Sequence, residues 1–346
     1  MKNLFVLAAI VTCLFLSISC NKKDNPVSHN STDTLYIADG NSFWTKLNGP
    51  YNASITCIKC DKNNYIYVGT YQNGLFISKD MGKTWSKTNF GDNVILVDDI
   101  NILYDGTIFV SSDAGYFEST NYGVTWTKLN PQFPAGIYYP KLYCLENGLY
   151  YVYDPKYING ATMTYIYFSK DKGTSWTKAP IDLKGSGGII GNNGLILLIS
   201  LVDSNSTKHI INIFSSSDFG KSFNPIYTST DIFDGGVSYN FALNSKNEIL
   251  IYVPMKGIIR SNDMGKSFES ISDSMYYFQL GFLKINNQDN MLLVTTSAGV
   301  YFSNNSGTLW QNILPFDIPA VYYFTNNNYI IKNVNSVLYI SKNPIN

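Results

Sequence analysis

One eight-residue pattern recurs six times along the chain, and it restricts the fold more than any other feature. Each copy has Ser at its first position, Asp or Asn at its third, Gly at its fifth and Trp or Phe at its eighth. The copies are SKDMGKTW (78–85), STNYGVTW (119–126), SKDKGTSW (169–176), SSDFGKSF (216–223), SNDMGKSF (261–268) and SNNSGTLW (303–310). Their final aromatics are 41, 50, 47, 45 and 42 residues apart. Periods of about 40 to 50 residues are typical of the blades of a β-propeller.

The segments between the copies read as short β-strands divided by turn residues. After Trp85, the stretches VDDINILYD, GTIFVSS and AGYFEST precede the next copy, which indicates four strands per unit. No amphipathic pattern of helical length interrupts them. Trp44, in ADGNSFWTKL, lies 41 residues before Trp85 and adds a seventh marker. The sequence therefore predicts an all-β fold, a seven-bladed β-propeller of four-stranded antiparallel blades.

The two ends of the chain predict how the ring of blades closes. The C-terminal stretches AVYYFT, NYIIK and SVLYISK supply three strands and stop where a further turn would begin. FWTKL, around Trp44, reads as a fourth strand without a blade of its own, so an N-terminal strand joining the C-terminal blade would complete the ring and remove free sheet edges. The stretch TLYIA (34–38) also has the pattern of a third strand. Eight partial blades, or an extra edge strand, stay open as alternatives.

Each residue type in the repeated turn has a local physical role. The acid or amide can accept hydrogen bonds from backbone N–H groups two residues on, glycine can adopt the positive φ of a tight reversal, and Ser or Thr can tie the ends together. The final aromatic begins the fourth strand and can pack between adjacent sheets. The predicted structural residues are Asp80, Gly82, Trp85, Asn121, Gly123, Trp126, Asp171, Gly173, Trp176, Asp218, Gly220, Phe223, Asp263, Gly265, Phe268, Asn305, Gly307 and Trp310.

The turn resembles the Asp-box, or BNR, repeat S-x-D-x-G-x-T-W of sialidases, xyloglucanase-type glycosidases, sortilin-like receptors and photosystem assembly factors. The resemblance covers residues 34–346, and two copies depart from it because Asn121 and Asn305 replace the acid. Box residues in that family are structural. The resemblance therefore implies a fold and leaves the function open.

The first twenty residues have the organisation of a secretory signal. A basic start at Lys2 is followed by an apolar run from Leu4 to Leu16, which is too short to span a bilayer. The ending resembles a bacterial lipoprotein signal, in which the cysteine, here Cys20, becomes the lipidated first residue of the mature protein. Ser17 stands where such signals usually have leucine. The alternative is an ordinary signal peptide cleaved near Ser19.

These features divide the chain into three parts. Residues 1–19 are predicted to be a signal peptide of the lipoprotein type, residues 20–33 a flexible polar tether, and residues 34–346 a single propeller. The resemblance implies a lipid-anchored protein of the cell envelope, at the outer membrane of a Gram-negative bacterium and facing the periplasm or the surface. The residue after the cysteine is Asn21, not the aspartate that retains some lipoproteins at the inner membrane.

Charge and cysteine content argue against several functions. The formal net charge is zero, so no basic footprint favours nucleic acid, and the only membrane contact expected is the lipid anchor. Cys57 and Cys60 are three positions apart in a strand-like stretch and so point to opposite faces, which argues against a disulfide. With Cys144, they are expected to be small buried thiols. The two histidines, His29 and His209, add no metal-ligand cluster. A monomer without metal or cofactor is expected.

The connections on one side of the propeller vary in length, whereas the repeated turns on the other side are uniformly short. We call the first side the variable face. Its connections are NPQFPAGIYYP (130–140), YDPKYINGATMT (153–164), LVDSNSTKH (201–209), IYTSTDIFDGGVSY (226–239) and SISDSMYYFQ (270–279). Variable loops on a rigid scaffold are where binding usually occurs, and exposed tyrosine suits stacking on a sugar or anchoring a protein. The candidate binding residues are Tyr138, Tyr139, Tyr157, Tyr276 and Tyr277.

Enzymatic activity is the competing interpretation. The sialidase resemblance implies three arginines that grip the substrate carboxylate, whereas this chain has only Arg260 and no Arg-Ile-Pro motif, which argues strongly against a sialidase. Other glycosidases need two carboxylates a few ångströms apart. The acids predicted on the variable face are Asp98, Asp99, Asp182, Asp231, Asp234, Asp273 and Asp317. None stands in a motif that distinguishes a catalytic acid from a solvated aspartate.

The sequence favours a non-catalytic propeller that binds a carbohydrate or protein partner through the variable face. One alternative is a xyloglucanase-like glycoside hydrolase, which would bring two of these acids within about 10 Å of each other. The other is an assembly scaffold for another envelope protein, similar to the photosystem assembly factors.

Overall fold

The computed structural model describes residues 43–345 apart from short gaps, and within them the chain forms thirty β-strands and no helix. The gaps lie at 51–52, 91–93, 138–139, 146–147, 159–160, 185–186, 193–194, 206–207, 229–232, 235–240, 254–256, 272–279, 287, 296–298 and 315–320. Some strand residues are described by their backbone alone. The possible extra strand at 34–38 lies outside the described residues.

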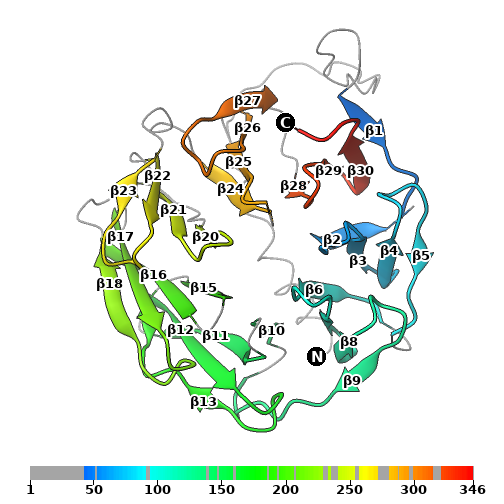
Figure 1. Cartoon of the computed structure of the whole chain (residues 1–346). Coiled ribbons are helices and arrows are strands. Elements are labelled where there is room, and N and C mark those ends of the chain that lie inside the picture. The colour runs from blue at the N-terminus through cyan, green and yellow to red at the C-terminus, as the bar shows by residue number, and fades with distance from the viewer. Residues whose placement is uncertain are drawn as a thin grey trace, which may run out of the picture. The chain divides into compact units, whose positions relative to one another are not determined.

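Seven antiparallel sheets of four main strands surround a common axis, which confirms the predicted seven-bladed propeller (Figure 1). Blades one to four are β2 (Ser54–Cys60), β3 (Ile66–Tyr71), β4 (Leu75–Ser78), β5 (Ser86–Lys87); β6 (Val97–Ile102), β7 (Ile108–Ser112), β8 (Gly115–Ser119), β9 (Thr127–Leu129); β10 (Leu142–Cys144), β11 (Tyr150–Ile158), β12 (Ala161–Ser169), β13 (Thr177–Lys178); and β15 (Gly187–Asn192), β16 (Leu195–Asn205), β17 (Lys208–Ser216), β18 (Asn224–Thr228).

The remaining three blades repeat the same order. They are β20 (Phe241–Leu243), β21 (Ile249–Val253), β22 (Gly257–Ser261), β23 (Glu269–Ser270); β24 (Leu280–Ile285), β25 (Met291–Thr295), β26 (Val300–Ser303), β27 (Gln311–Leu314); and β28 (Val321–Phe324), β29 (Ile330–Val334), β30 (Val337–Ser341), β1 (Trp44–Lys46). The first strand of each blade lies nearest the axis (Figure 1). We call these seven strands the axial strands: β2, β6, β10, β15, β20, β24 and β28.

The seventh blade joins the two ends of the folded region. β1 pairs antiparallel with β30, and Trp44 lies opposite Ser341. Hydrogen bonds continue on both sides of the ladder, because Leu47 N–H donates to the carbonyl of Leu338 and Lys342 N–H donates to that of Phe43, both at 2.9 Å. The predicted closure by an N-terminal strand is confirmed.

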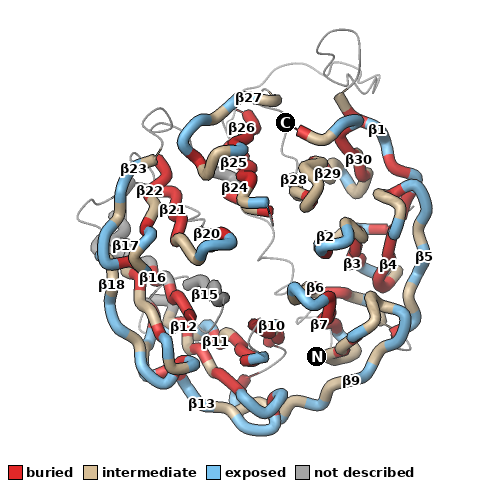
Figure 2. Tube along the Cα trace, in the orientation of Figure 1, coloured by how far each residue is buried: buried red, intermediate tan, exposed pale blue. Residues whose placement is uncertain are grey.

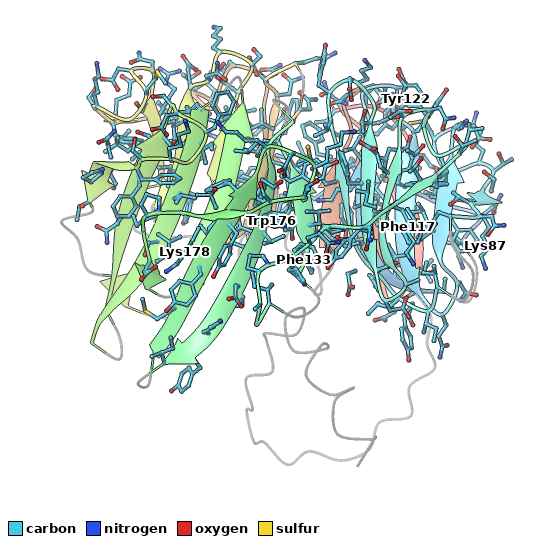
Figure 3. All side chains as sticks on the ribbon, turned by 90° about the horizontal axis from the view of Figure 1, so that it is seen from below. Lys87, Phe117, Tyr122, Phe133, Trp176 and Lys178 are labelled. Atoms are coloured by element: carbon cyan, nitrogen blue, oxygen red, sulfur yellow. The ribbon has the colours of Figure 1, made fainter. Side chains whose placement is uncertain are left out.

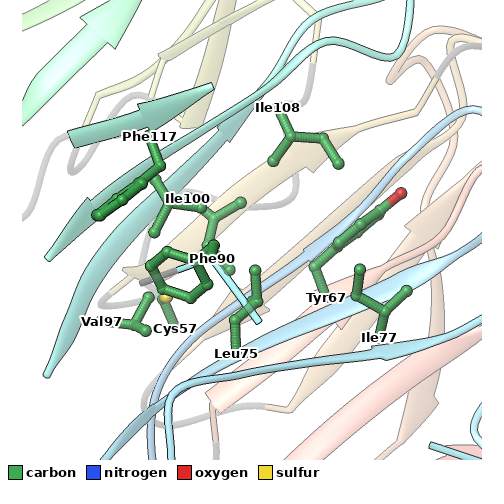
Figure 4. Close-up of a cluster of buried hydrophobic side chains, with 10 residues drawn as sticks. Cys57, Tyr67, Leu75, Ile77, Phe90, Val97, Ile100, Ile108 and Phe117 are labelled. Atoms are coloured by element: carbon green, nitrogen blue, oxygen red, sulfur yellow. The ribbon is translucent and has the colours of Figure 1, made fainter. Parts of the chain in front are cut away.

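Buried side chains form one cluster between each pair of neighbouring blades, and Figure 2 shows the buried segments running along the middle strands. In one cluster, Tyr67 and Leu75 of the first blade pack with Val97 and Ile100 of the second (Figure 4). Each cluster includes one of the marker aromatics Trp44, Trp85, Trp126, Trp176, Phe223, Phe268 and Trp310. Each marker aromatic thus belongs to one interface between blades, and the number of residues between successive markers is the length of chain from one interface to the next.

A shared hydrogen-bond pattern holds each repeated turn between the third and fourth strands. In the first blade, the Ser78 hydroxyl donates to Asp80 Oδ1 at 2.8 Å and accepts from Gly82 N–H at 2.7 Å. Asp80 Oδ1 also accepts from Thr84 N–H at 2.8 Å. The acid therefore bonds to the amide four residues on rather than two, because the turn is longer than a simple Asx turn.

Two consecutive residues with positive φ reverse the chain in every repeated turn. They are Met81–Gly82, Tyr122–Gly123, Lys172–Gly173, Phe219–Gly220, Met264–Gly265 and Ser306–Gly307. Glycine is also needed for space: a Cβ at Gly173 would lie 2.7 Å from Pro131 Cβ, on the segment that leaves the preceding blade. The glycine thus provides both the turn and the close approach of two blades.

Candidate functional site

Two hairpins of the variable face are longer than the others. β11 and β12 pair without interruption from Tyr150 opposite Ser169 to Ile158 opposite Ala161, and β16 and β17 pair as far as Asn205 opposite Lys208. The long green strands of these hairpins are visible in Figure 3. We call the third and fourth blades the tall blades.

The prediction of loops at 153–164 and 201–209 is therefore wrong, since most of these residues belong to the paired strands of the two hairpins. Continuous pairing satisfies backbone N–H and C=O groups that a loop would leave to solvent. Each tall blade also carries a fifth short strand. β14 (Leu183–Lys184) pairs with β12, and β19 (Phe233–Asp234) pairs with β17. These additions widen the outer part of both hairpins.

Tyr157 lies near the end of the first tall hairpin, opposite Thr162. Its side chain is 78% exposed, the largest exposed fraction among the large hydrophobic residues that the structure describes. The neighbouring Lys156 forms an ion pair with Asp154 at 3.1 Å, and its ammonium lies 5.9 Å from the Tyr165 ring. Of the five candidate binding tyrosines, Tyr157 alone is described. The other four, Tyr138, Tyr139, Tyr276 and Tyr277, lie outside the described residues.

Other tyrosines pack within the blades instead of facing a partner. Tyr143 stacks on Tyr151 with ring centroids 5.1 Å apart, and Tyr153 meets both rings edge-on. The Tyr143 hydroxyl donates to Asp99 Oδ2 at 3.0 Å. Burial, followed by the charge of Asp99, raises the pKa of Tyr143 far above its usual value, so this phenol stays a hydrogen-bond donor. Tyrosine content alone therefore overstates the number of binding residues.

The three candidate acids with described side chains do not behave alike. Asp182 is exposed and pairs with Lys178 at 2.7 Å. Asp98 and Asp99 are adjacent at a bulge in β6 (Val97–Ile102), where the pairing with β7 shifts register. Burial raises the pKa of Asp98, and Lys141 opposes this effect. Asp99 instead accepts from Tyr143 and lies 4.0 Å from Lys59 Nζ.

The remaining acids have no described side chain. Asp234 lies in β19, where the backbone alone is described, and Asp231, Asp273 and Asp317 lie outside the described residues. Arg260 donates to Glu269 on the adjacent strand, with the shorter bond at 2.6 Å. Among the candidate acids with described side chains, Asp98 and Asp99 are the two that lie next to each other, and Asp99 is already engaged by Tyr143 and Lys59.

Sequence analysis missed a group of residues at one level of the axial strands. Each axial strand has one residue at an equivalent register position, opposite the second residue of the hairpin's return strand or its equivalent. These partners are Tyr67, Phe109, Tyr151, Leu197, Leu250, Leu292 and Ile331. The axial-strand residues opposite them are Lys59, Asn101, Tyr143, Ile190, Ala242, Lys284 and Tyr323, which we call the axial ring. The signal was a lysine at matching positions in CIKCD and FLKIN, 225 residues apart.

Cysteine and metal chemistry have little support in the described region. Cys57, Cys60 and Cys144 are free thiols, Cys57 and Cys144 being buried and Cys60 half-buried. Burial raises the pKa of both Cys57 and Cys60 to about 12, which keeps them unreactive at neutral pH. Within the residues described, no group of three potential ligands is placed to hold a metal ion. None of the described elements is a helix long and apolar enough to cross a membrane.

Comparison with known proteins identifies similar folds only. No known family model matches the chain, and no curated protein matches it. YCF48 bound to a D1 peptide is 15% identical, with a TM-score of 0.57 over 89% of this chain and 97% of that chain. The GH74 enzyme of Niastella koreensis is 14% identical, with a TM-score of 0.60 over 85% of this chain and 44% of that chain. PorZ of Porphyromonas gingivalis, a surface component of the type-IX secretion system, is 13% identical, with a TM-score of 0.54 over 85% of this chain and 47% of that chain.

The chain is a seven-bladed β-propeller. At these identities, the likeness extends to the fold and not to a site. The neighbours include an enzyme, a protein with a bound peptide and a secretion component, so the same scaffold serves both catalysis and binding. The GH74 enzyme and PorZ are more than twice as long as the region they share with this chain.

Proposed function

We propose that this propeller is a non-catalytic binding protein of the cell envelope and that the tall blades capture its partner. The observation that carries the proposal is Tyr157, which is 78% exposed near the end of a continuous hairpin. A strand-borne aromatic loses little conformational freedom on binding, and such residues commonly dominate interfaces. The partner is a protein or a carbohydrate, since either can use the apolar face and the polar tip of a tyrosine.

The state of the described acids supports binding over hydrolysis. Asp182 is held by Lys178, and Asp99 is held by Tyr143 and Lys59. YCF48, a propeller of similar fold, has a bound D1 peptide, and PorZ is a component of a secretion system, which supports a protein-binding role here. An assembly scaffold is a special case of this proposal. A xyloglucanase-like hydrolase is its competitor.

The proposed location follows from the N-terminal sequence. A signal peptide at 1–19, lipidation at Cys20 and a polar tether at 20–33 would anchor the propeller to the outer membrane and let its binding face reach a neighbouring envelope component. PorZ, a protein of similar fold, is a bacterial surface component, which is compatible with the proposed location. Labelling with radioactive palmitate, lost in Cys20→Ala, would test the anchor.

A photo-crosslinking experiment tests the binding face. The photoreactive residue p-benzoylphenylalanine replaces Tyr157 in one protein and Leu309 in a control. Leu309 is 74% exposed but lies in a repeated turn on the opposite face. We expect a discrete adduct from position 157 only, and a loss of affinity of about tenfold or more for the isolated partner in Tyr157→Ala. Equal adducts from both positions would contradict the proposal.

A glycan array and a hydrolysis screen on the propeller separate the kinds of partner. Saturable glycan binding that Tyr157→Ala abolishes and Leu309→Ala leaves intact would identify a carbohydrate partner. Release of sugar from a polysaccharide would overturn the non-catalytic proposal and direct attention to Asp98 and Asp99. A protein adduct without glycan binding would identify a protein partner.

A further inference from the structure

The axial ring contains two lysines from opposite ends of the sequence, and the charge of one acts on the other. Lys59 lies on β2 and Lys284 on β24, at equivalent positions of their blades. The only blade between them is the seventh, whose residue at this level is Tyr323. The first and third strands of a blade run in the same direction, so their ends lie on the same face. The next-to-last residue of an axial strand is therefore close to the face of the repeated turns, away from Tyr157.

Asp99 partly neutralises the first lysine. Its Oδ1 lies 4.0 Å from Lys59 Nζ, and its Oδ2 accepts the hydrogen bond from the Tyr143 hydroxyl. Both charged side chains remain in contact with solvent, with 44% of Lys59 and 20% of Asp99 exposed. A small ligand in solution can therefore reach this ion pair.

Lys284 has no such partner among the described residues. No carboxylate there lies within ion-pair distance of its ammonium, although the side chain is exposed to solvent. Burial by surrounding protein and, to a smaller extent, the charge of Lys59 lower the pKa of Lys284 to about 8, although Asp99 opposes both effects. The lysine thus remains largely protonated at neutral pH while its charge lacks compensation.

We propose that Lys284 and Lys59 bind one singly charged oxyanion of the carboxylate class at the propeller axis. Two ammonium groups and the single carboxylate of Asp99 leave one positive charge, which a monoanion balances and a phosphate dianion exceeds. Lys284 provides the main attraction, since Asp99 already occupies Lys59. At the same level the neighbouring fifth blade contributes only the methyl group of Ala242. This site is separate from Tyr157, so each can fail without the other.

Acetate is the probe for this site, and nuclear magnetic resonance of the ligand at constant ionic strength measures its affinity. We expect saturable binding in the millimolar range, because so small a ligand makes few contacts. Lys284→Met should weaken binding about tenfold, whereas Lys266→Met, on an exposed repeated turn, should leave it unchanged. Inorganic phosphate should bind no more tightly than acetate. Binding that survives Lys284→Met would overturn the proposal.

A second variant changes the affinity in the opposite direction. Asp99→Asn removes the internal competitor for Lys59 and keeps an acceptor for Tyr143, so acetate should bind about tenfold more tightly. If this cluster served only to hold the blades together, neither the parent protein nor either variant would bind acetate. Weaker binding in Asp99→Asn would therefore also refute the proposal. Thermal melting of each variant confirms that the comparison is made between folded proteins.

Discussion

Trp44 of β1 lies directly opposite Ser341 of β30, so residues from the two ends of the folded chain form one ladder. Trp44 is 5% exposed and contacts Phe43 edge-on with ring centroids 4.8 Å apart. The Lys332 ammonium lies 5.1 Å from its ring. Closure of the propeller therefore combines backbone pairing with the burial of one large aromatic side chain.

Truncating this side chain should weaken closure. We expect Trp44→Ala to lower the free energy of unfolding by about 3–5 kcal/mol, the usual cost of deleting a buried large aromatic side chain. Urea denaturation followed by circular dichroism would measure the change. Leu309→Ala is a suitable control, because its side chain is 74% exposed and its truncation should change stability by less than about 0.5 kcal/mol. A similar loss in both variants would show that Trp44 has no special role.

Gly173 should be sensitive to the smallest possible substitution. Its φ of 87° disfavours any side chain, and an added Cβ would lie 2.7 Å from the rigid Pro131 ring. Gly148 has a similar φ of 77° but no atom within 4 Å of an added Cβ. We expect Gly148→Ala to cost about 1 kcal/mol from backbone strain alone and Gly173→Ala to cost at least about 2 kcal/mol. Equal losses in chemical denaturation would show that the contact with Pro131 is relieved easily.

The acid of a repeated turn should be replaceable by its amide. In the second blade, Asn121 Oδ1 accepts from Thr125 N–H at 2.8 Å, as Asp80 does from Thr84 in the first. Its Nδ2 donates to the Thr125 hydroxyl, which then acts as the acceptor. At pH 7 Asp80→Asn should therefore melt closer to the parent than Asp80→Ala, which should melt about 2–4 °C lower. Equal melting of the Asn and Ala variants would show that the side-chain oxygen is dispensable.

The same comparison has a pH dependence of known sign. Hydrogen bonds from Thr84 lower the pKa of Asp80 to about 2, below its ordinary value near 3.8. The unfolded chain binds the proton more tightly, so this contribution to stability is present above about pH 4 and is lost as the pH falls towards 2. Asp80→Asn should reduce the acid sensitivity of unfolding in that window. Identical profiles of melting temperature against pH would contradict the assignment.

The repeat made the fold predictable, whereas blade-specific features were less so. Seven marker aromatics fixed the number of blades and the closure at Trp44, because each interface between blades requires one such side chain. In sequence, the stretch 153–164 favours a loop, because Pro155 lacks an N–H donor and turn residues surround it. Asn159 and Gly160, a common hairpin pair, stand between β11 and β12 and were the available signal.

The axial ring could not be found from local sequence. Lys59 and Lys284 are ordinary lysines in their own strands, and their relationship depends on the register of seven ladders and on ring closure. Tyr157 was predicted from its residue type and from the variable connection that contains it. Its 78% exposure, in contrast to the packed Tyr143 and Tyr151, depends on how far the hairpin extends. The propeller fold could therefore be predicted from the sequence, whereas the proposed site at Lys59 and Lys284 required the register of the folded blades.

Lys284 should make stability depend on alkaline pH. Its folded-state pKa is about 8, while the lysine of an unfolded chain titrates near 10.5. Protonated Lys284 therefore destabilises the folded state, and because the unfolded state binds more protons between these values, this destabilisation decreases as the pH rises from 8 towards 10.5. The charged groups that act on it are Lys59 and Asp99, and the raised pKa of Tyr143 keeps that phenol neutral in this window. Urea denaturation of Lys284→Met should therefore show a less positive slope of unfolding free energy against pH than the parent protein, while Lys266→Met should keep the parental slope. Parallel slopes for all three proteins would mean that the ammonium of Lys284 is as well solvated as that of a surface lysine, which would contradict its lowered pKa.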